Sequence, residues 1–173
     1  ILAQAWGDVP KKDHSTKTPE EVMSAATPQY ELLKWVASEM EACLPLAAET
    51  LENAPSRVVK VTMQGILARV YLFMAGASVE GNEAFRTEYY GKARDYAWEV
   101  IKSARGLEGA ASLNIQLNPS YSQVFINMIK DTYDKTYNES LWEVDFLGDR
   151  SSSAAWTNGR IGDLIGLQSN GAD

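Results

Sequence analysis

The 173-residue chain is poor in residues that hold metals or form crosslinks: it has one cysteine, Cys43, and one histidine, His14. A lone cysteine excludes an internal disulfide, and the pair provides too few ligands for a typical zinc or iron site. The sequence has no apolar run of about 18 residues and therefore predicts no membrane-spanning helix. Its formal net charge of −7 argues against nucleic acid, because a phosphate backbone requires clustered Lys and Arg. No motif indicates a cofactor.

We predict no catalytic role for Cys43 or His14. Cys43 falls on an apolar helical position without a nearby histidine, so we expect a buried structural thiol. His14 lies between Asp13 and Ser15 in a charged loop. These three residues are consecutive, whereas Ser-His-Asp triads are assembled from separated segments. We therefore expect a solvated loop histidine.

Helix signals begin near the N-terminus. The first residues predict the last turns of a helix that ends at Gly7. Thr18, Pro19 and Glu21 form a capping-box pattern for a short helix over residues 19–26. The next helix is predicted to carry one apolar stripe and to end or kink at Pro45. That stripe consists of Tyr30, Leu33, Ala37, Met40 and Leu44.

Two longer helices, over residues 62–78 and 85–104, are predicted to form a hairpin whose turn contains Gly81 and Asn82. Gly106 and Gly109 are predicted to end the second helix. Small residues are expected where the two backbones meet: Gly65 and Ala68 on the first helix, and Ala93 and Ala97 on the second. Bulky Tyr71, Phe73 and Tyr90 are expected to close the gaps around them. This pattern is typical of tetratricopeptide-type hairpins, which generally bind partners. The aromatic residues expected in the core are Tyr30, Tyr71, Tyr90, Trp98 and Trp142.

Residues 105–173 have the composition of loops, with a helical turn predicted over 121–126. Alternation of Trp142, Val144 and Phe146 predicts a short strand over residues 141–146. The expected fold class is mainly α, with tetratricopeptide-like helical hairpins (an α-α superhelix), irregular loops and one minor strand. We interpret residues 1–173 as part of one helical domain that is incomplete at both ends, because the chain opens inside a helix without Met.

Two groups of residues are candidates for a functional site. Glu143 and Asp145 share one face of the predicted strand, as a pair of glycosidase carboxylates would, although the polar face of any strand gives the same pattern. Trp156 lies in a loop with Asn158 and Arg160. An aromatic ring beside amide and guanidinium donors suits a sugar, which stacks on the ring and accepts hydrogen bonds at its hydroxyls. The alternative is a tryptophan that anchors a long loop.

A series of segments, taken in order, resembles the SusD/RagB family of outer-membrane lipoproteins from Bacteroidetes. The segments are Trp-Gly-Asp-Val-Pro at 6–10, Glu-Glu-Val-Met at 20–23, Gln-Tyr-Glu-Leu-Leu at 29–33, Ala-Arg-Val-Tyr-Leu at 68–72, Tyr-Tyr at 89–90 with Ala93, Ala97 and Val-Ile at 100–101, Asn-Glu-Ser-Leu-Trp-Glu-Val at 138–144, and Gly-Arg-Ile-Gly at 159–162. The hairpin departs from the family pattern at its start, because Lys60 is shifted relative to Thr62 and small residues are fewer.

The resemblance implies a surface-exposed lipoprotein of the outer membrane that binds a glycan or peptide without catalysis and delivers it to a TonB-dependent, SusC-like transporter. The lipid anchor would lie outside this fragment, since Cys43 does not match the lipidation site. The resemblance assigns no binding role to Trp156. Two rival hypotheses remain: an intracellular helical-repeat module that binds a protein partner, and a glycoside hydrolase that uses Glu143 and Asp145.

Overall fold

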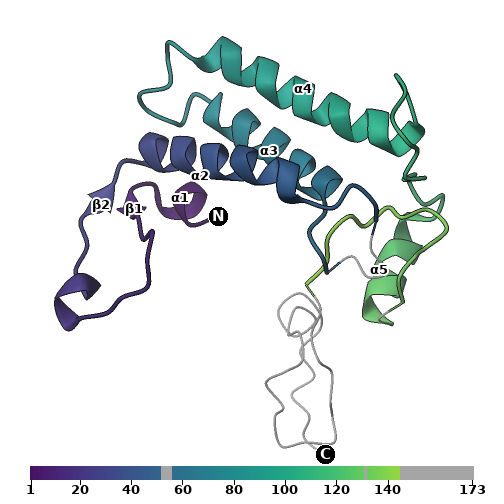
Figure 1. Cartoon of the computed structure of the whole chain (residues 1–173), viewed down its shortest axis with the longest axis horizontal. Helices are drawn as coiled ribbons and strands as arrows, with labels where there is room; N and C mark the ends of the chain where they lie inside the picture. The colour runs from purple at the N-terminus through teal and green to yellow at the C-terminus, as the bar shows by residue number, and fades with distance from the viewer. Residues whose placement is uncertain (52–55, 131, 145–173) are drawn as a thin grey trace, which may run out of the picture. The chain divides into compact units, whose positions relative to one another are not determined.

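The computed structural model describes residues 1–51, 56–130 and 132–144, and these residues are mainly helical (Figure 1). The chain divides into two compact units, residues 1–142 and 143–173, and nearly all described residues belong to the first. The helices are α1 (Leu2–Trp6), α2 (Gln29–Cys43), α3 (Lys60–Met74), α4 (Arg86–Arg105) and α5 (Tyr121–Ile129), with the 3-10 helices η1 (Pro19–Val22) and η2 (Leu44–Leu46). No helix in the described residues is long and apolar enough to cross a membrane.

The core of the first unit lies where α2, α3 and α4 pack side by side (Figure 1). Leu67 and Met74 of α3 and Val79 of the following turn are almost completely inaccessible to solvent. Tyr30, Leu33 and Ala37 of α2 are buried in the same cluster, and Met40 and Leu44 pack against it. The apolar stripe predicted for α2 is therefore the face that this helix turns toward its neighbours, because residues three and four apart share one helical face.

The predicted hairpin is confirmed as two packed helices, α3 and α4, within a few residues of the expected bounds. Asn82 in the connecting turn is fully buried, and its amide donates to the backbone oxygens of Met74 and Gly76 while its side-chain oxygen accepts from Arg86 Nε. The bond to Met74 satisfies a carbonyl group at the end of α3 that the helix leaves free, and the bond to Gly76 holds the turn. Gly106 ends α4 in the left-handed conformation, as predicted.

The face of α4 that packs on α3 differs from the predicted one. Tyr89 and Ala93 are buried and Tyr96 packs against the core, whereas Ala97 is exposed, Tyr90 is 52% exposed and Trp98 is 41% exposed. The placement of Ala97, Tyr90 and Trp98 inside the fold was therefore wrong. Aromatic residues occur on two faces of α4, so periodicity alone could not identify the face that α3 covers.

The N-terminal region contains a two-stranded sheet that the sequence did not predict. Strand β1 (Val9–Pro10) pairs antiparallel with β2 (Ala26–Thr27), and Val9 lies opposite Thr27. The helix expected over residues 19–26 is only the single 3-10 turn η1. The Glu21 carboxylate accepts from the backbone N–H of Lys17 rather than from that of Thr18, so the predicted capping box is not formed in its usual register.

The segment after α4 is irregular as far as α5, as expected, and α5 is longer than the single turn predicted. The stretches before and after α5 lie side by side: the Gln116 N–H donates to the Tyr137 carbonyl at 2.7 Å, and Asn118 bonds Asp134 and Glu139. Residues 141–144 form no strand, and the remaining two positions of the predicted strand lie outside the described residues. Trp142 is 49% exposed, so its expected place in the core was wrong.

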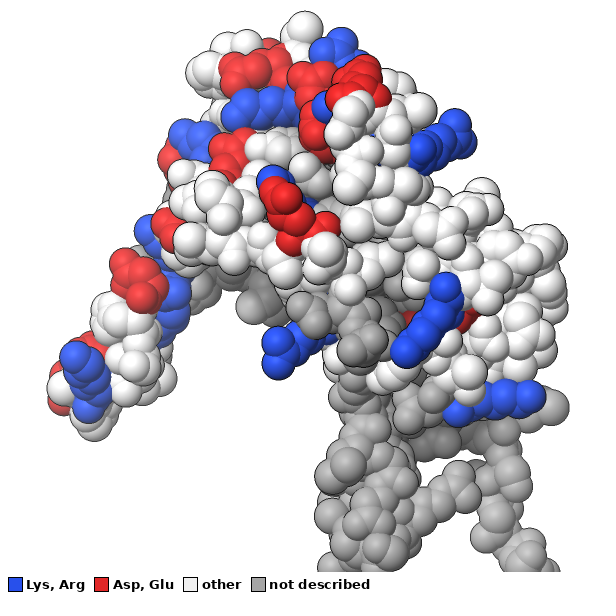
Figure 2. All heavy atoms as spheres, turned by 45° about the vertical axis from the view of Figure 1, so that its right-hand side comes forward, with Lys and Arg blue, Asp and Glu red and all other residues white. Residues whose placement is uncertain are grey.

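Charged side chains are spread unevenly over the surface. Figure 2 shows acidic and basic residues gathered in the upper part of this face, while the surface at the right, where α5 lies in Figure 1, is mostly uncharged. Residues 109–129 contain no Lys, Arg, Asp or Glu.

Gly65 is not required for close approach of α3 to α4, and we expect Gly65→Ala to stabilise the fold. A Cβ at this position would meet Val100 Cγ2 at 3.9 Å, which is ordinary van der Waals contact. Replacing glycine by alanine inside a helix then raises the free energy of unfolding by about 0.5–1 kcal/mol, measurable by urea denaturation. Gly106→Ala is the contrasting variant: φ is 66° there and a Cβ would lie 3.0 Å from Ser112 Cβ, so its stability falls. A loss of stability in both variants would contradict this account of Gly65.

Candidate functional site

The carboxylate of Glu41 lies on α2, faces α3 and α4, and accepts hydrogen bonds from three side chains of those two helices. Its Oε1 atom accepts hydrogen bonds from Tyr71 Oη on α3 at 2.7 Å and from Tyr96 Oη on α4 at 2.9 Å. Lys92 Nζ on α4 donates to the same oxygen at 3.4 Å and to Tyr71 Oη at 3.1 Å. We refer to Glu41, Tyr71, Lys92 and Tyr96 as the Glu41 cluster. It joins all three core helices through one carboxylate oxygen.

Ring contacts complete this cluster. The rings of Tyr71 and Tyr96 are stacked, with centroids 5.9 Å apart and planes within 5° of parallel. Lys92 Nζ lies 4.8 Å from the centre of the Tyr71 ring, within the range of a cation–π interaction. Below them Tyr89 packs against Tyr71 and exchanges a hydrogen bond of 2.7 Å with Tyr30 of α2. The tyrosine pair Tyr30–Tyr89 is therefore a second link between α2 and α4.

The electrostatics of the cluster fix the protonation of its members at neutral pH. Burial alone would raise the pKa of Glu41, but the hydrogen bonds from Tyr71 and Tyr96 and the charge of Lys92 outweigh it and lower that pKa below its ordinary value. Burial, followed by the hydrogen bond to Glu41, raises the pKa of both Tyr71 and Tyr96. Glu41 is therefore an ionised acceptor, and both phenols are protonated donors rather than bases.

A hollow of 190 Å³ lies beside the cluster. It is lined by side chains from all three helices: Lys34, Ala37, Ser38, Glu41, Tyr71, Met74, Glu88, Tyr89 and Lys92. The volume is below the 300–1,000 Å³ typical of small-molecule sites. Each donor of the cluster is already bonded to Glu41 or to a tyrosine. The arrangement therefore fits a polar clamp between helices better than a site with groups aimed at a ligand.

The residues predicted to bind a glycan, Trp156, Asn158 and Arg160, lie outside the described residues. Of the predicted carboxylate pair, Glu143 is half-buried and Asp145 also lies outside that part of the chain. That Trp156 lies beside Asn158 and Arg160, and Glu143 beside Asp145, therefore stays a prediction. Within the described ranges, no group of three or more His, Cys, Asp and Glu residues could hold a metal ion.

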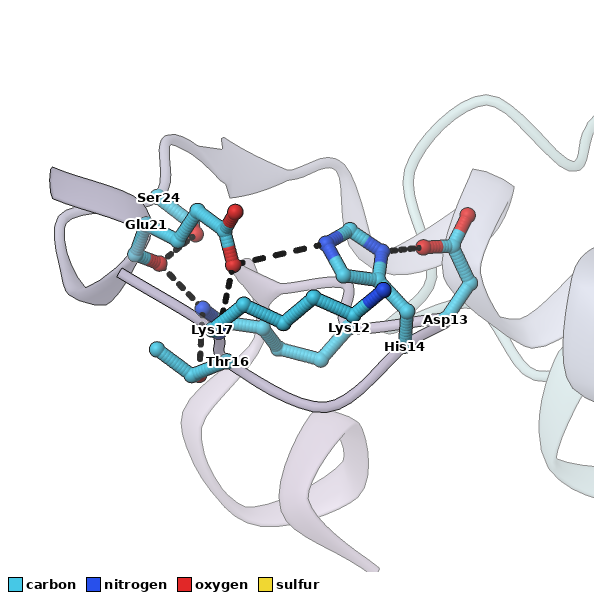
Figure 3. Close-up of polar contacts among 7 residues, drawn as sticks. All are labelled: Lys12, Asp13, His14, Thr16, Lys17, Glu21 and Ser24. Atoms are coloured by element: carbon cyan, nitrogen blue, oxygen red, sulfur yellow. Dashed lines mark hydrogen bonds and ion pairs between the residues drawn. The ribbon is translucent and has the colours of Figure 1, made fainter. Parts of the chain in front are cut away.

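The N-terminal loop brings His14 between two carboxylates, as Figure 3 shows. His14 Nδ1 lies 2.6 Å from Asp13 Oδ1, and Nε2 lies 3.8 Å from Glu21 Oε2. Ser24 donates to the backbone oxygen of Glu21 and not to the histidine. The His14 side chain is 60% exposed, which confirms the predicted solvated loop histidine. Cys43, in contrast, is exposed at the end of α2, so the predicted buried thiol was wrong.

Sequence reasoning identified Tyr71 but not its partners Glu41, Lys92 and Tyr96. A signal was available on α4, because Tyr89, Lys92 and Tyr96 follow the spacing i, i+3, i+7 and so share one face. That Glu41 would meet this face could not be read from α2 alone, since it depends on how far α2 is shifted along α3.

Comparison with known proteins adds no relative: no family model, no curated protein and no solved structure matches the chain.

We expect Tyr71→Phe to lower the free energy of unfolding by about 1.5 kcal/mol, because it removes a hydrogen bond to an ionised carboxylate and a bond accepted from Lys92. Tyr90→Phe is the matched control. Its side chain is half exposed on α4 of the same hairpin, and the change should stay within about 0.5 kcal/mol. If both changes lower the free energy of unfolding equally in urea denaturation, the Glu41 cluster does not stabilise the contact between the helices.

The clamp also predicts how stability depends on pH. Because folding lowers the pKa of Glu41, its contribution is present above the pKa of the unfolded chain and is lost as pH falls through the lower folded value. The difference in unfolding free energy between the wild type and Glu41→Gln should therefore shrink between about pH 6 and pH 3. Glu39→Gln, at an exposed position of α2, is the control and should change stability little at either pH. A wild-type advantage over Glu41→Gln that stays constant across this range would contradict the prediction.

Proposed function

We propose that the chain is a non-catalytic component of a cell-surface uptake system that binds a glycan and delivers it to a TonB-dependent transporter. The observation that carries the proposal is the ordered series of segments that resembles the SusD/RagB family, from residues 6–10 to residues 159–162. In this proposal the protein is held at the outer membrane by a lipid anchor. The proposal also identifies the α3–α4 hairpin as a tetratricopeptide-like repeat.

The positions of the resembling residues support a structural role for the helices and a ligand-binding role for the loops. Tyr30, Tyr71, Tyr89 and Ala93 belong to the resembling segments and are buried where α2, α3 and α4 meet. The Glu41 cluster then joins these helices. A frame whose polar groups bond one another is suited to hold loops in place, so we assign ligand binding to the loops that follow it.

The proposed binding residues are Trp156, Asn158 and Arg160. A flat indole stacks on the C–H face of a sugar ring, and the amide and guanidinium groups donate to its hydroxyls. The proposal therefore favours a neutral, hydroxyl-rich ligand over an anionic one.

Trp156→Ala is expected to weaken glycan binding about tenfold or more, since a central tryptophan commonly contributes most of the energy of a contact. The measurement is glycan-array screening followed by isothermal titration with the glycan selected. Trp6→Ala is the matched control, because Trp6 is 71% exposed on α1, and it should leave affinity unchanged. Unchanged affinity in Trp156→Ala would remove Trp156 from the site.

The same glycan also tests the hypothesis that the protein binds its ligand without hydrolysing it. We expect the bound glycan to be recovered intact after prolonged incubation with the wild type. Hydrolysis that Glu143→Gln abolishes would instead establish the rival glycoside hydrolase, with Glu143 as one of its two carboxylates.

A further inference from the structure

Helix α5 turns its apolar side chains outward. Its three less exposed residues are Gln123, Val124 and Asn127, and the two amides bond each other at 2.7 Å. The exposed apolar residues on and just before the helix are Leu117, Tyr121, Phe125, Ile126, Met128 and Ile129, which are 39–85% exposed. We refer to these six residues as the α5 face. A surface helix normally has the opposite arrangement, with its apolar stripe toward the protein.

The α5 face also lies in the longest stretch without charge in the sequence, residues 109–129. In Figure 2 the right-hand part of the surface is mostly uncharged, with a few Lys or Arg side chains on it. Contiguous apolar surface of this kind marks an interaction site on soluble proteins. The residues Tyr121, Phe125 and Met128 follow the spacing i, i+4, i+7, so one partner helix could contact all three at once.

We propose that the α5 face binds a second copy of this chain, with two α5 helices packed against each other about a twofold axis. This proposal is independent of the glycan-binding function.

The charge distribution favours a second copy. The chain carries a net charge of −7, so contact between two copies through most of the surface brings like charges together. Residues 109–129 carry none, and two α5 faces meet without that repulsion. A twofold contact places the same patch on both sides, which an all-apolar face satisfies without further complementarity.

The area agrees with a reversible dimer. Taking about 170 Å² for a fully exposed large apolar side chain, the α5 face presents about 600 Å² per copy. Covering both faces would bury about 1,200 Å² in total, which is the lower end for specific, stable interfaces. A lipid surface fits less well, because helices that lie on membranes carry Lys or Arg on their polar face and α5 has neither.

The test is sedimentation equilibrium of the full 173-residue chain over about 1–500 μM, a range chosen for an interface of this size. The Cys43→Ser background prevents disulfide dimers through the exposed thiol. We expect the mass to rise from 19.1 kDa toward twice that value with concentration. Phe125→Asp with Ile129→Asp should hold the mass at 19.1 kDa throughout, and circular dichroism should be unchanged because both side chains are exposed. Leu72→Asp, at an exposed position of α3, is the control and should still dimerise.

Crosslinking provides a second readout that does not depend on introducing charge. Phe125 is the central residue of α5, so in an antiparallel pair it lies next to the Phe125 of the other copy. Phe125→Cys in the Cys43→Ser background should form an intermolecular disulfide under mild oxidation, whereas Leu72→Cys should not. A mass of 19.1 kDa for the starting chain at every concentration would overturn the proposal, as would dimers that persist in the double Asp variant. Flotation of the chain with phosphatidylcholine vesicles, lost in that variant, would assign the face to lipid instead.

Discussion

The carboxylate of Glu41 is the contact through which the three core helices depend on one another. Apolar packing brings α2, α3 and α4 together, but such packing does not by itself fix how far one helix is shifted along another. The hydrogen bonds from Tyr71 and Tyr96 to one oxygen do, because each requires a donor distance near 2.8 Å. Tyr30 and Tyr89 fix the other end of α2 against α4 in the same way. The two links together determine the register of α2 on the hairpin.

This clamp explains why a polar group is tolerated near the core. An ionised carboxylate that loses water requires compensating donors, and Glu41 has two phenols and an ammonium group. Among the described residues, no buried side-chain nitrogen or oxygen is without a hydrogen-bond partner. The cluster thereby gives the helical frame a fixed geometry without providing a free base or nucleophile. That property suits a scaffold, and it supports our proposal that ligand binding belongs to loops.

On α5 the arrangement is the reverse of that in the core, since the apolar side chains are exposed and the two amides face inward. The same chain thus has one surface where polar groups complete an internal contact and another where apolar groups have no partner among the described residues. The proposed twofold contact and the proposed glycan site concern different parts of the chain. A dimer would present two copies of the loops that follow α5, and two weak sites on one assembly bind a polymeric glycan more tightly than either alone.

The sequence by itself determined the helical elements whose apolar residues occupy a single face. On α2 the stripe from Tyr30 to Leu44 lies in or against the core, and Pro45 prevents continuation, so much of the buried face and the end of the helix followed from local chemistry. The turn at Gly81 and Asn82 and the stop at Gly106 were equally local.

Only the tertiary structure decided between faces that the sequence left equivalent. Tyr89 and Tyr90 are neighbours on α4, and a rotation of about 100° per residue places one in the core and the other in solvent. Cys43 and Trp142 occupy positions that look apolar in sequence, and they are exposed because no helix or strand among the described residues covers them. The meeting of Glu41 with Tyr71 and Tyr96 joins residues 30 and 55 positions apart. Contacts over such separations depend on the packing of whole helices, which periodicity within one helix does not contain.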